Sequence, residues 1–188
     1  MCPEELCDSS LAAQNQQVRV FMMTETDREL LLETAGRSLT AHAPADRTEL
    51  SASVKVFTLN NRTTVAFLAG KVDSGTVVVL PLPLGKTIVG RSADICPYAD
   101  CSELKGIVEG FQWIVKIAAG VCEIQDASST NGAIRIPGRR IDATRSEPWK
   151  LLLQYPEFAI PSDSAVDVLQ GDCIANVFCV FVFGWMVT

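Results

Sequence analysis

Residues 121–132 read VCEIQDASSTNG, a short alternating segment that runs into a loop of small hydroxyl and amide side chains. Alternation of apolar and polar residues is typical of a half-buried β-strand. Ser, Thr, Asn and Gly favour turns, because Asn and Gly tolerate positive φ and hydroxyls bond to nearby backbone. The same groups, with exposed backbone N–H groups, can also hold an anion such as a phosphate. The loop is therefore either a plain turn or a recognition loop.

Further β-type runs lie on both sides of this loop. Turn residues Asn, Asp and Gly separate them at intervals of about 8 to 12 residues, which is typical of a β-sandwich or barrel. The runs are ASVKVFTL (52–59), TTVAFLAG (63–70), TVVVLPLPLG (76–85), KTIVGR (86–91), GFQWIVKIA (110–118), AIRIPG (133–138) and IANVFCVFVF (174–183). The sequence thus predicts an all-β domain.

One helix is expected before these strands. Thr26 and Glu29 have the spacing of a capping box, three consecutive leucines follow, and Gly36 is placed as a stop signal. We predict a short helix over 26–35, outside the sandwich.

Composition narrows the function classes. The chain has 188 residues, 48% of them hydrophobic, enough to bury a core without metals or disulfides. Its net charge of −6 is the wrong sign for a protein that binds nucleic acid by neutralising phosphates. The apolar run at 176–187 is shorter than the roughly 20 residues of a membrane helix and suits a buried strand. With no secretory signal visible, we expect an intracellular protein, in cytoplasm or nucleus, that binds neither nucleic acid nor membrane.

Cysteine and histidine give little sign of metal or catalytic chemistry. Seven cysteines are an odd number, which fits free thiols. The pairs Cys2/Cys7 and Cys96/Cys101 share a C-x4-C spacing, which would allow zinc if the N-terminus folded back, but common zinc ribbons use C-x2-C. The single histidine, His42, lies in a polar stretch without a neighbouring nucleophile. We expect no metal, no cofactor and no enzymatic activity.

Four segments, taken in order, resemble the forkhead-associated (FHA) domain family. They are TIVGRSADI (87–95), FQWIVKI (111–117), GVCEIQDASSTNGAIRIPGRRI (120–141) and LQGDCIANVFCVFVF (169–183). The family shows a G-R pair, an S-R-x-H turn, an S-T-N-G loop and a G-D-x-I segment in this order. The resemblance covers about residues 63–183. It implies an antiparallel β-sandwich whose loops at one end bind phosphothreonine peptides, without catalysis.

The resemblance also assigns candidate phosphopeptide-binding residues. Arg91 matches the arginine that grips phosphate, a task that suits the planar guanidinium fork. Ser129 and Thr130 lie in the hydroxyl-bearing loop, where Thr130 matches the phosphate contact, and Asn131 matches the amide that holds the peptide backbone.

The S-R-x-H turn departs from the family pattern. Residues 108–113, VEGFQW, place Glu109, Gly110 and Gln112 where the family has serine, arginine and histidine. We treat these three as degenerate pocket positions. At about 4 Å, two like unit charges cost roughly 4 kcal/mol at an effective dielectric of about 20. That exceeds the roughly 1.5 to 3 kcal/mol of a charge-assisted hydrogen bond, so Glu109 is expected to impair phosphate binding, and it could pair with Arg91.

The domain is expected to carry two additions. We predict an N-terminal extension over 1–52, an FHA-like sandwich over 53–188, and an insertion over 142–167 with a helical turn near WKLLLQY (149–155). The apolar side chains of the two additions exceed what exposed appendages normally show, so we predict partner contacts there. The candidates are Leu31, Trp149, Leu152, Tyr155 and Phe158. The insertion covers either its own sandwich or a partner.

Two functions follow from these features. The first is a structural or scaffolding subunit that keeps the FHA sandwich and binds protein partners without phosphate. The alternative is a phosphothreonine-peptide reader in signalling. Glu109 and the apolar additions favour the scaffold.

Overall fold

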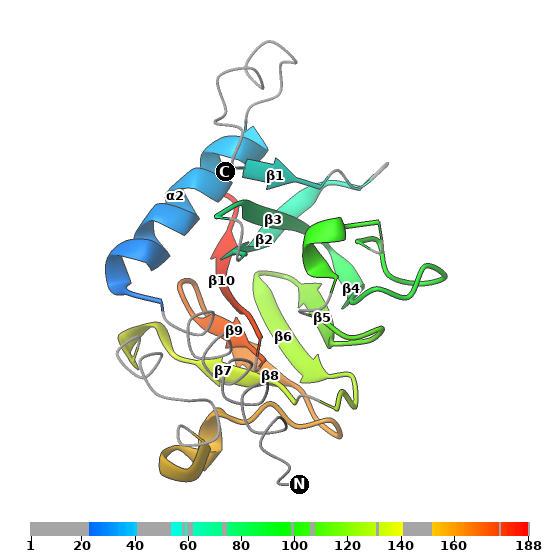
Figure 1. Cartoon of the computed structure of the whole chain (residues 1–188), viewed down its shortest axis with the longest axis vertical. Coiled ribbons are helices and arrows are strands. Elements are labelled where there is room, and N and C mark those ends of the chain that lie inside the picture. Colours follow the sequence, from blue (N-terminus) through cyan, green and yellow to red (C-terminus); the bar gives the residue numbers. More distant parts are fainter. Residues whose placement is uncertain are drawn as a thin grey trace, which may run out of the picture.

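The computed structural model describes residues 23–40, 54–57, 59, 62–72, 75–98, 100–105, 108–130, 132–140, 152–176 and 178–187. Within them, ten strands form two stacked sheets (Figure 1). The two-layer sandwich predicted from the sequence is therefore confirmed. No helix in the described ranges is long and apolar enough to span a bilayer.

The larger sheet has six strands in the order β1-β3-β2-β10-β9-β7. Its members are β1 (Val54–Val56), β2 (Thr64–Lys71), β3 (Val77–Pro83), β7 (Ile134–Ile136), β9 (Cys173–Ala175) and β10 (Val180–Trp185). The expected edge strand at 52–59 is β1, but it pairs with β3 in parallel, whereas the other pairs are antiparallel. The run 174–183 is two strands rather than one, because Asn176 turns the chain between β9 and β10.

The smaller sheet has four strands in the order β4-β5-β6-β8, all antiparallel. They are β4 (Gly85–Val89), β5 (Trp113–Ala118), β6 (Val121–Asp126) and β8 (Val166–Val168). Strand β8 overlaps the end of the predicted insertion (142–167) and was not among the expected strands. The loops carry short 3-10 helices, among them η2 (Ser102–Leu104) between β4 and β5 and η4 (Pro156–Phe158) between β7 and β8.

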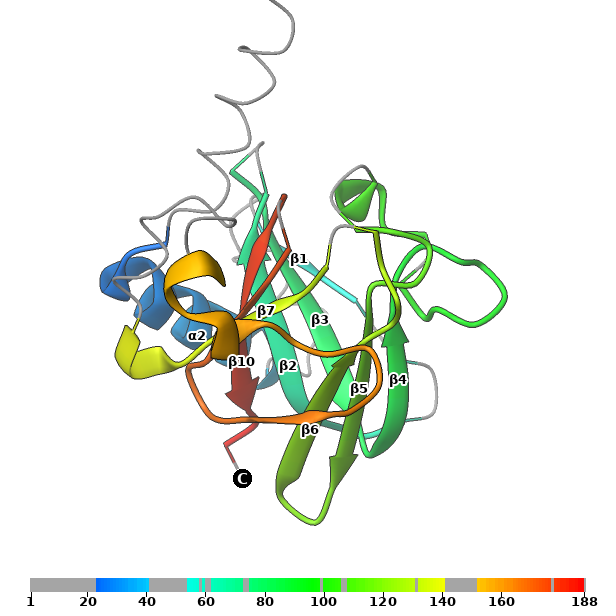
Figure 2. The ribbon, with the colours of Figure 1, turned by 90° about the horizontal axis from the view of Figure 1, so that it is seen from below.

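Alternate residues of the larger sheet face two different cores. In β10, Phe181 and Phe183 pack between the sheets, while Val180 and Val182 face outward. The outer face is covered by helix α2 (Glu25–Thr40), which lies across β2 and β10 (Figure 2). Strands buried on both faces need continuous apolar sequence, which explains the run at 180–183. The prediction that this segment is a buried strand is confirmed.

Helix α2 is longer than expected at both ends. Its capping box is formed by Thr24 and Asp27: the Asp27 N–H donates to Thr24 Oγ1 at 3.1 Å and the Thr24 N–H to Asp27 Oδ2 at 3.1 Å. The expected Thr26–Glu29 box is therefore wrong by two residues. Gly36 does not end the helix, since the chain stays helical to Thr40.

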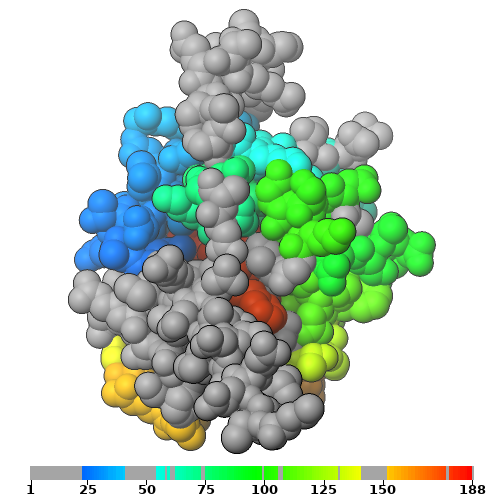
Figure 3. Space-filling view, viewed as in Figure 1, coloured from blue at the N-terminus to red at the C-terminus, as the bar shows by residue number. Residues whose placement is uncertain are grey.

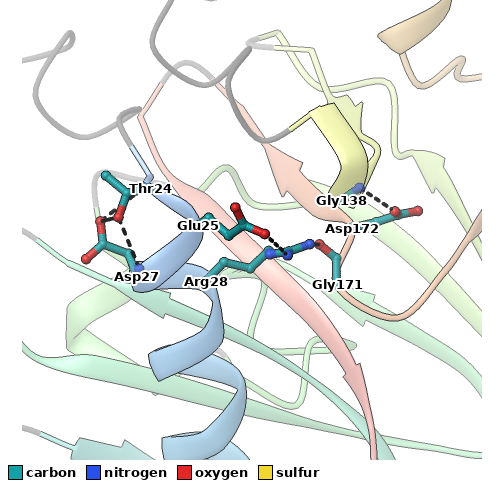
Figure 4. A network of polar contacts seen from close by, with 7 residues as sticks. All are labelled: Thr24, Glu25, Asp27, Arg28, Gly138, Gly171 and Asp172. Atoms are coloured by element: carbon teal, nitrogen blue, oxygen red, sulfur yellow. Dashed lines mark hydrogen bonds and ion pairs between the residues drawn. The ribbon is translucent and has the colours of Figure 1, made fainter.

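Arg28 joins α2 to the turn at Gly171 and lies close to the turn at Gly138 (Figure 4). Its Nη1 donates to the Gly171 carbonyl at 3.4 Å, and a Cβ on Gly138 would lie 2.6 Å from the same nitrogen. Beneath it the buried Asp172 carboxylate accepts hydrogen bonds from Arg135 Nε at 2.9 Å, the Gly138 N–H at 3.0 Å and the Leu169 N–H at 2.9 Å. The helix is thus joined to the G-D turn of the sandwich.

Candidate functional site

Arg91 follows β4 at one end of the sandwich. Gly90 precedes it and lies so close to Gly110 that a Cβ there would overlap the Gly110 carbonyl. The Arg91 N–H bonds to the carbonyls of Glu109 at 3.1 Å and Gly110 at 3.0 Å, and its Nε donates to the Val108 carbonyl at 2.6 Å. The residue is nevertheless exposed. Arg91 is therefore anchored through its backbone and Nε while its side chain stays at the surface.

The loop after β6 is held by Asp126. Its carboxylate accepts the Ser129 hydroxyl at 2.6 Å and the Ser129 N–H at 3.2 Å, while Ser128 adopts a φ of 61°. The Ser129 hydroxyl is thus used inside the loop, whereas Thr130 is exposed. Asn131, the remaining candidate, lies outside the described residues.

Glu109 binds this loop directly. Its Oε2 accepts a hydrogen bond from the Thr130 N–H at 2.8 Å. The Arg91–Glu109 pairing suggested by the sequence is wrong: the ion pairs within the described ranges are Arg28–Glu25, Arg37–Glu33, Lys55–Glu103 and Arg135–Asp172. A carboxylate therefore lies on a backbone donor of the STNG loop, and Arg91, Glu109 and Thr130 share one corner of the molecule.

Gln112, the third degenerate pocket position, lies beneath the surface of this corner. Its side chain is buried, and its Nε2 donates to Ser129 Oγ at 3.0 Å and the Gly132 carbonyl at 3.1 Å. Its Oε1 accepts from Asn176 Nδ2 at 3.0 Å and from the Glu109 N–H at 3.3 Å. Gln112 ties the two loops of the corner to the β9–β10 turn from beneath.

Gly110, the second degenerate pocket position, has no side chain and makes no contact like those of Glu109 and Gln112. A Cβ at this position would meet nothing within 4 Å, so the site where the family carries arginine faces open space. Of the three predicted pocket positions, Glu109 contacts the loop, Gly110 leaves a gap, and Gln112 is internal.

Two of the predicted partner contacts belong to the core instead. Leu31 and Phe158 are 5% and 6% exposed and pack in the cluster between α2 and the larger sheet. Leu152 and Tyr155 pack against the same cluster, and Trp149 lies outside the described residues. The described part of the insertion therefore covers its own sandwich, in a short helical segment over 152–154 and in η4. Figure 3 shows this segment and α2 on the same side of the molecule.

The five described cysteines are buried thiols that form no disulfide. Burial raises the pKa of Cys122 and of Cys173 to about 12, so both thiols stay protonated at neutral pH and are unreactive. No group of three or more metal-ligating side chains occurs within the described ranges. Cys2, Cys7 and His42 fall outside them.

Sequence reasoning missed Asp126 and Asn176, which hold the loops of this corner. Asp126 is in phase with the inward residues of β6, and an acidic residue at the end of an otherwise apolar inward row is a signal for a loop cap. Asn176 gave no such signal, because it lies within a continuous apolar run.

No protein-family model matches the sequence, and no curated protein sequence matches it. Solved structures similar to this chain are FHA domains of several proteins. An FHA domain from a study of phosphothreonine-dependent FHA interactions has a TM-score of 0.43 and 17% identity, covering 66% of this chain and 100% of that one. The FHA domain of an Arabidopsis thaliana hypothetical protein has a TM-score of 0.44 and 14% identity, covering 70% and 96%.

The FHA domain of human APLF, solved with an XRCC1 bisphospho peptide, has a TM-score of 0.42 and 15% identity, covering 64% of this chain and 97% of that one. These neighbours are of the family that the sequence motifs resemble. Because their scores and identities are low, what the present chain binds has to be inferred from its own side chains.

Proposed function

We propose that this protein is a non-catalytic FHA-like protein–protein interaction module with impaired phosphothreonine recognition, acting as a structural or scaffolding subunit of a larger assembly. The observation that carries the proposal is the Glu109 carboxylate on the Thr130 N–H at 2.8 Å. A phosphate that entered this corner would find the Thr130 N–H already bonded and would meet a negative charge beside it.

The energetic balance supports this proposal. Two like charges about 4 Å apart cost roughly 4 kcal/mol at an effective dielectric of about 20. A charge-assisted hydrogen bond from Arg91 to the phosphate would contribute about 1.5 to 3 kcal/mol. The Nε of Arg91 already donates to the Val108 carbonyl, so it is not available for the phosphate. The turn also carries Gly110 and buried Gln112 where side chains could otherwise reach a ligand. One exposed guanidinium does not offset the repulsion.

The alternative function is a phosphothreonine-peptide reader. It is favoured by the exposure of both Arg91 and Thr130 at the same corner. The two functions make different demands on Glu109. A reader would need the Glu109 side chain to move away from the loop when the phosphate binds, whereas in the scaffold it stays on the loop and opposes phosphate binding.

Replacement of Glu109 separates the two. Glu109→Ser removes the like charge, frees the Thr130 N–H and adds a hydroxyl donor. We expect the variant to bind a phosphothreonine peptide library at least about tenfold more tightly than the wild type, which corresponds to about 1.4 kcal/mol. Adding Arg91→Ala should abolish the gain. Asp163→Ser, which removes an exposed loop carboxylate elsewhere, is the matched control and should leave binding unchanged.

Micromolar binding of the wild-type chain to such peptides, lost with Arg91→Ala and on dephosphorylation, would establish the reader instead. If neither the wild type nor Glu109→Ser binds, the corner serves only as a turn that joins strands, and impaired recognition is the wrong description.

A further inference from the structure

The two sheets differ in what lies on their outer faces. The outer face of the larger sheet packs against α2 and residues 152–158, whereas the outer face of the four-stranded sheet lies on the opposite side of the sandwich from α2 (Figure 2). On that face Lys86, Lys116 and Asp167 are exposed. An antiparallel sheet can face water on one side, so exposure alone indicates nothing.

The strand register gives this face an unusual charge row. Lys86 lies opposite Lys116, Lys116 opposite Glu123, and Glu123 opposite Asp167. Two cations therefore stand side by side on β4 and β5, and two anions side by side on β6 and β8. Like charges directly opposite on neighbouring strands destabilise a sheet. None of the four side chains takes part in an ion pair within the described ranges.

Apolar side chains flank the charge row on the same face. Ile88 lies opposite Ile114 in the next row, and both are half-buried. On the other side of the charges Ala118 lies opposite Val121, which is 50% exposed. A shallow hollow lies on this face, lined by Lys86, Ile114, Lys116, Glu123, Gln125 and Ala165. The face thus combines partly exposed apolar side chains with one strip of segregated charge.

A charge row that is positive at one end and negative at the other is complementary to itself. Consider a two-fold axis that runs parallel to the strands, in the plane above the face, between β5 and β6. Rotation about this axis brings the β4 and β5 positions of one copy over the β8 and β6 positions of the other. Lys86 would then face Asp167 of the second copy, and Lys116 would face its Glu123. Such an isologous arrangement is the commonest symmetry of soluble oligomers, and aligned sheets pack face to face in this way.

We propose that the outer face of the four-stranded sheet is a homodimer interface, in which the Lys86–Lys116 half of one copy binds the Glu123–Asp167 half of the other. The arrangement offsets the like-charge pairs within each sheet and covers Ile88, Ile114 and Val121. This proposal does not depend on the corner formed by Arg91, Glu109 and Thr130, and it holds whether or not that corner binds phosphate.

Charge reversal in two complementary variants tests this proposal on the full chain. Lys86→Glu/Lys116→Glu makes the row wholly negative, and Glu123→Lys/Asp167→Lys makes it wholly positive. Sedimentation equilibrium over a concentration series should give a dimer for the wild type and monomers for both variants, with dissociation constants raised at least about tenfold. An equimolar mixture of the two variants should again sediment as a dimer, and high salt should weaken it.

The control is Glu33→Lys/Arg37→Glu, which swaps an exposed ion pair on α2 and should leave the mass of the wild-type dimer unchanged. Circular dichroism of both reversed variants checks that the sandwich is intact. Should either variant fail to fold, the milder Lys116→Gln and Glu123→Gln variants are expected to weaken the dimer in the same direction. A wild-type chain that stays monomeric at high concentration, or a mixture of folded variants that does not associate, would overturn the proposal.

Discussion

Asp172 and Glu109 use the same chemistry in two different settings. Each carboxylate accepts a backbone N–H from a loop, Gly138 and Leu169 for Asp172, and Thr130 for Glu109. The Asp172 side chain is 3% exposed, and it also accepts a hydrogen bond from Arg135. Its role is therefore to hold turns of the fold together. Glu109 is only half-buried and binds a loop residue that is itself exposed. The comparison teaches that burial separates a carboxylate that serves only the fold from one that stays accessible at the surface.

The largest expected effect is at Asp172. Replacing it with Asn removes the charge and leaves Arg135 without its ionic partner in a partly buried place. We expect a loss of about 3 to 5 kcal/mol in the free energy of unfolding, as for broken buried pairs. Urea denaturation measures it, with Asp163→Asn as an exposed control that should stay within about 0.5 kcal/mol of the wild type. If Asp172→Asn had the same free energy of unfolding as the wild type, Asp172 would not be a structural carboxylate in the sense proposed here for a buried residue.

Adjacent leucines of α2 extend the comparison to the helix. Leu31 is buried against the larger sheet, whereas Leu30 is 59% exposed. Leu31→Ala should lower the free energy of unfolding by about 2 to 4 kcal/mol, and Leu30→Ala by less than about 0.5 kcal/mol. Thermal or urea unfolding of both variants decides the point. Similar small losses would mean that α2 is an appendage of the sandwich.

Gln112 tests how firmly the corner itself is built. Gln112→Ala removes the hydrogen bonds that this side chain makes to Asn176, Ser129 and the Gly132 carbonyl, and each lost hydrogen bond costs about 0.5 to 1.5 kcal/mol. We expect a loss of about 2 kcal/mol together with faster amide exchange at Ser129 and Thr130, because the loop loses its tie. Unchanged exchange in a destabilised variant would show that the loop is held by Asp126 alone.

The smallest effect is expected at the surface pair of Lys55 and Glu103. Their atoms Nζ and Oε2 lie 2.7 Å apart, and the hydrogen bond from Lys55 is the main cause that lowers the pKa of Glu103 to about 2 from its ordinary value of 4.5. A lowered pKa stabilises the folded state above pH 4.5, and this contribution is lost as the pH falls toward 2. Lys55→Met should cost less than about 1 kcal/mol at neutral pH, because the pair is partly exposed.

The difference in unfolding free energy between Lys55→Met and the wild type should therefore shrink as the pH is lowered from neutral to about 3. Denaturant unfolding at several pH values measures this trend. A difference that stays constant with pH would assign the effect to packing of the Lys55 stem on Phe57, whose ring lies 5.5 Å from the ammonium.

The sandwich could be predicted from the sequence because its strands carry a repeated local signal. Alternation and turn residues locate β2, β5 and β6 closely, while the parallel direction of β1 was missed because a strand's residue pattern does not encode the direction of its neighbour. Strand β8 was missed because three residues, VDV, are too short to stand out. Helix α2 was recognised from its leucines, but its ends depend on side-chain bonds such as Thr24–Asp27.

The corner was predictable only in part. Arg91 and Thr130 could be placed from motifs, since each follows directly from a strand or a turn. Gln112 precedes Trp113, and the alternation of β5 would point it outward, yet the loops fold over it and bury it. Partner contacts were assigned to Leu31 and Phe158 because apolar residues in appendages suggest exposure, whereas a second core uses them. Contacts between segments far apart in sequence decide these cases.

The most direct test of the central claim follows the amide resonance of Thr130 in the isotope-labelled chain while a phosphothreonine peptide is added. In the wild type the Glu109 carboxylate holds this N–H, so we predict that the resonance stays in place at peptide concentrations where the Glu109→Ser variant shows a saturable shift. A saturable shift in the wild type at micromolar peptide, reversed by phosphatase treatment, would contradict the claim that Glu109 impairs phosphate recognition.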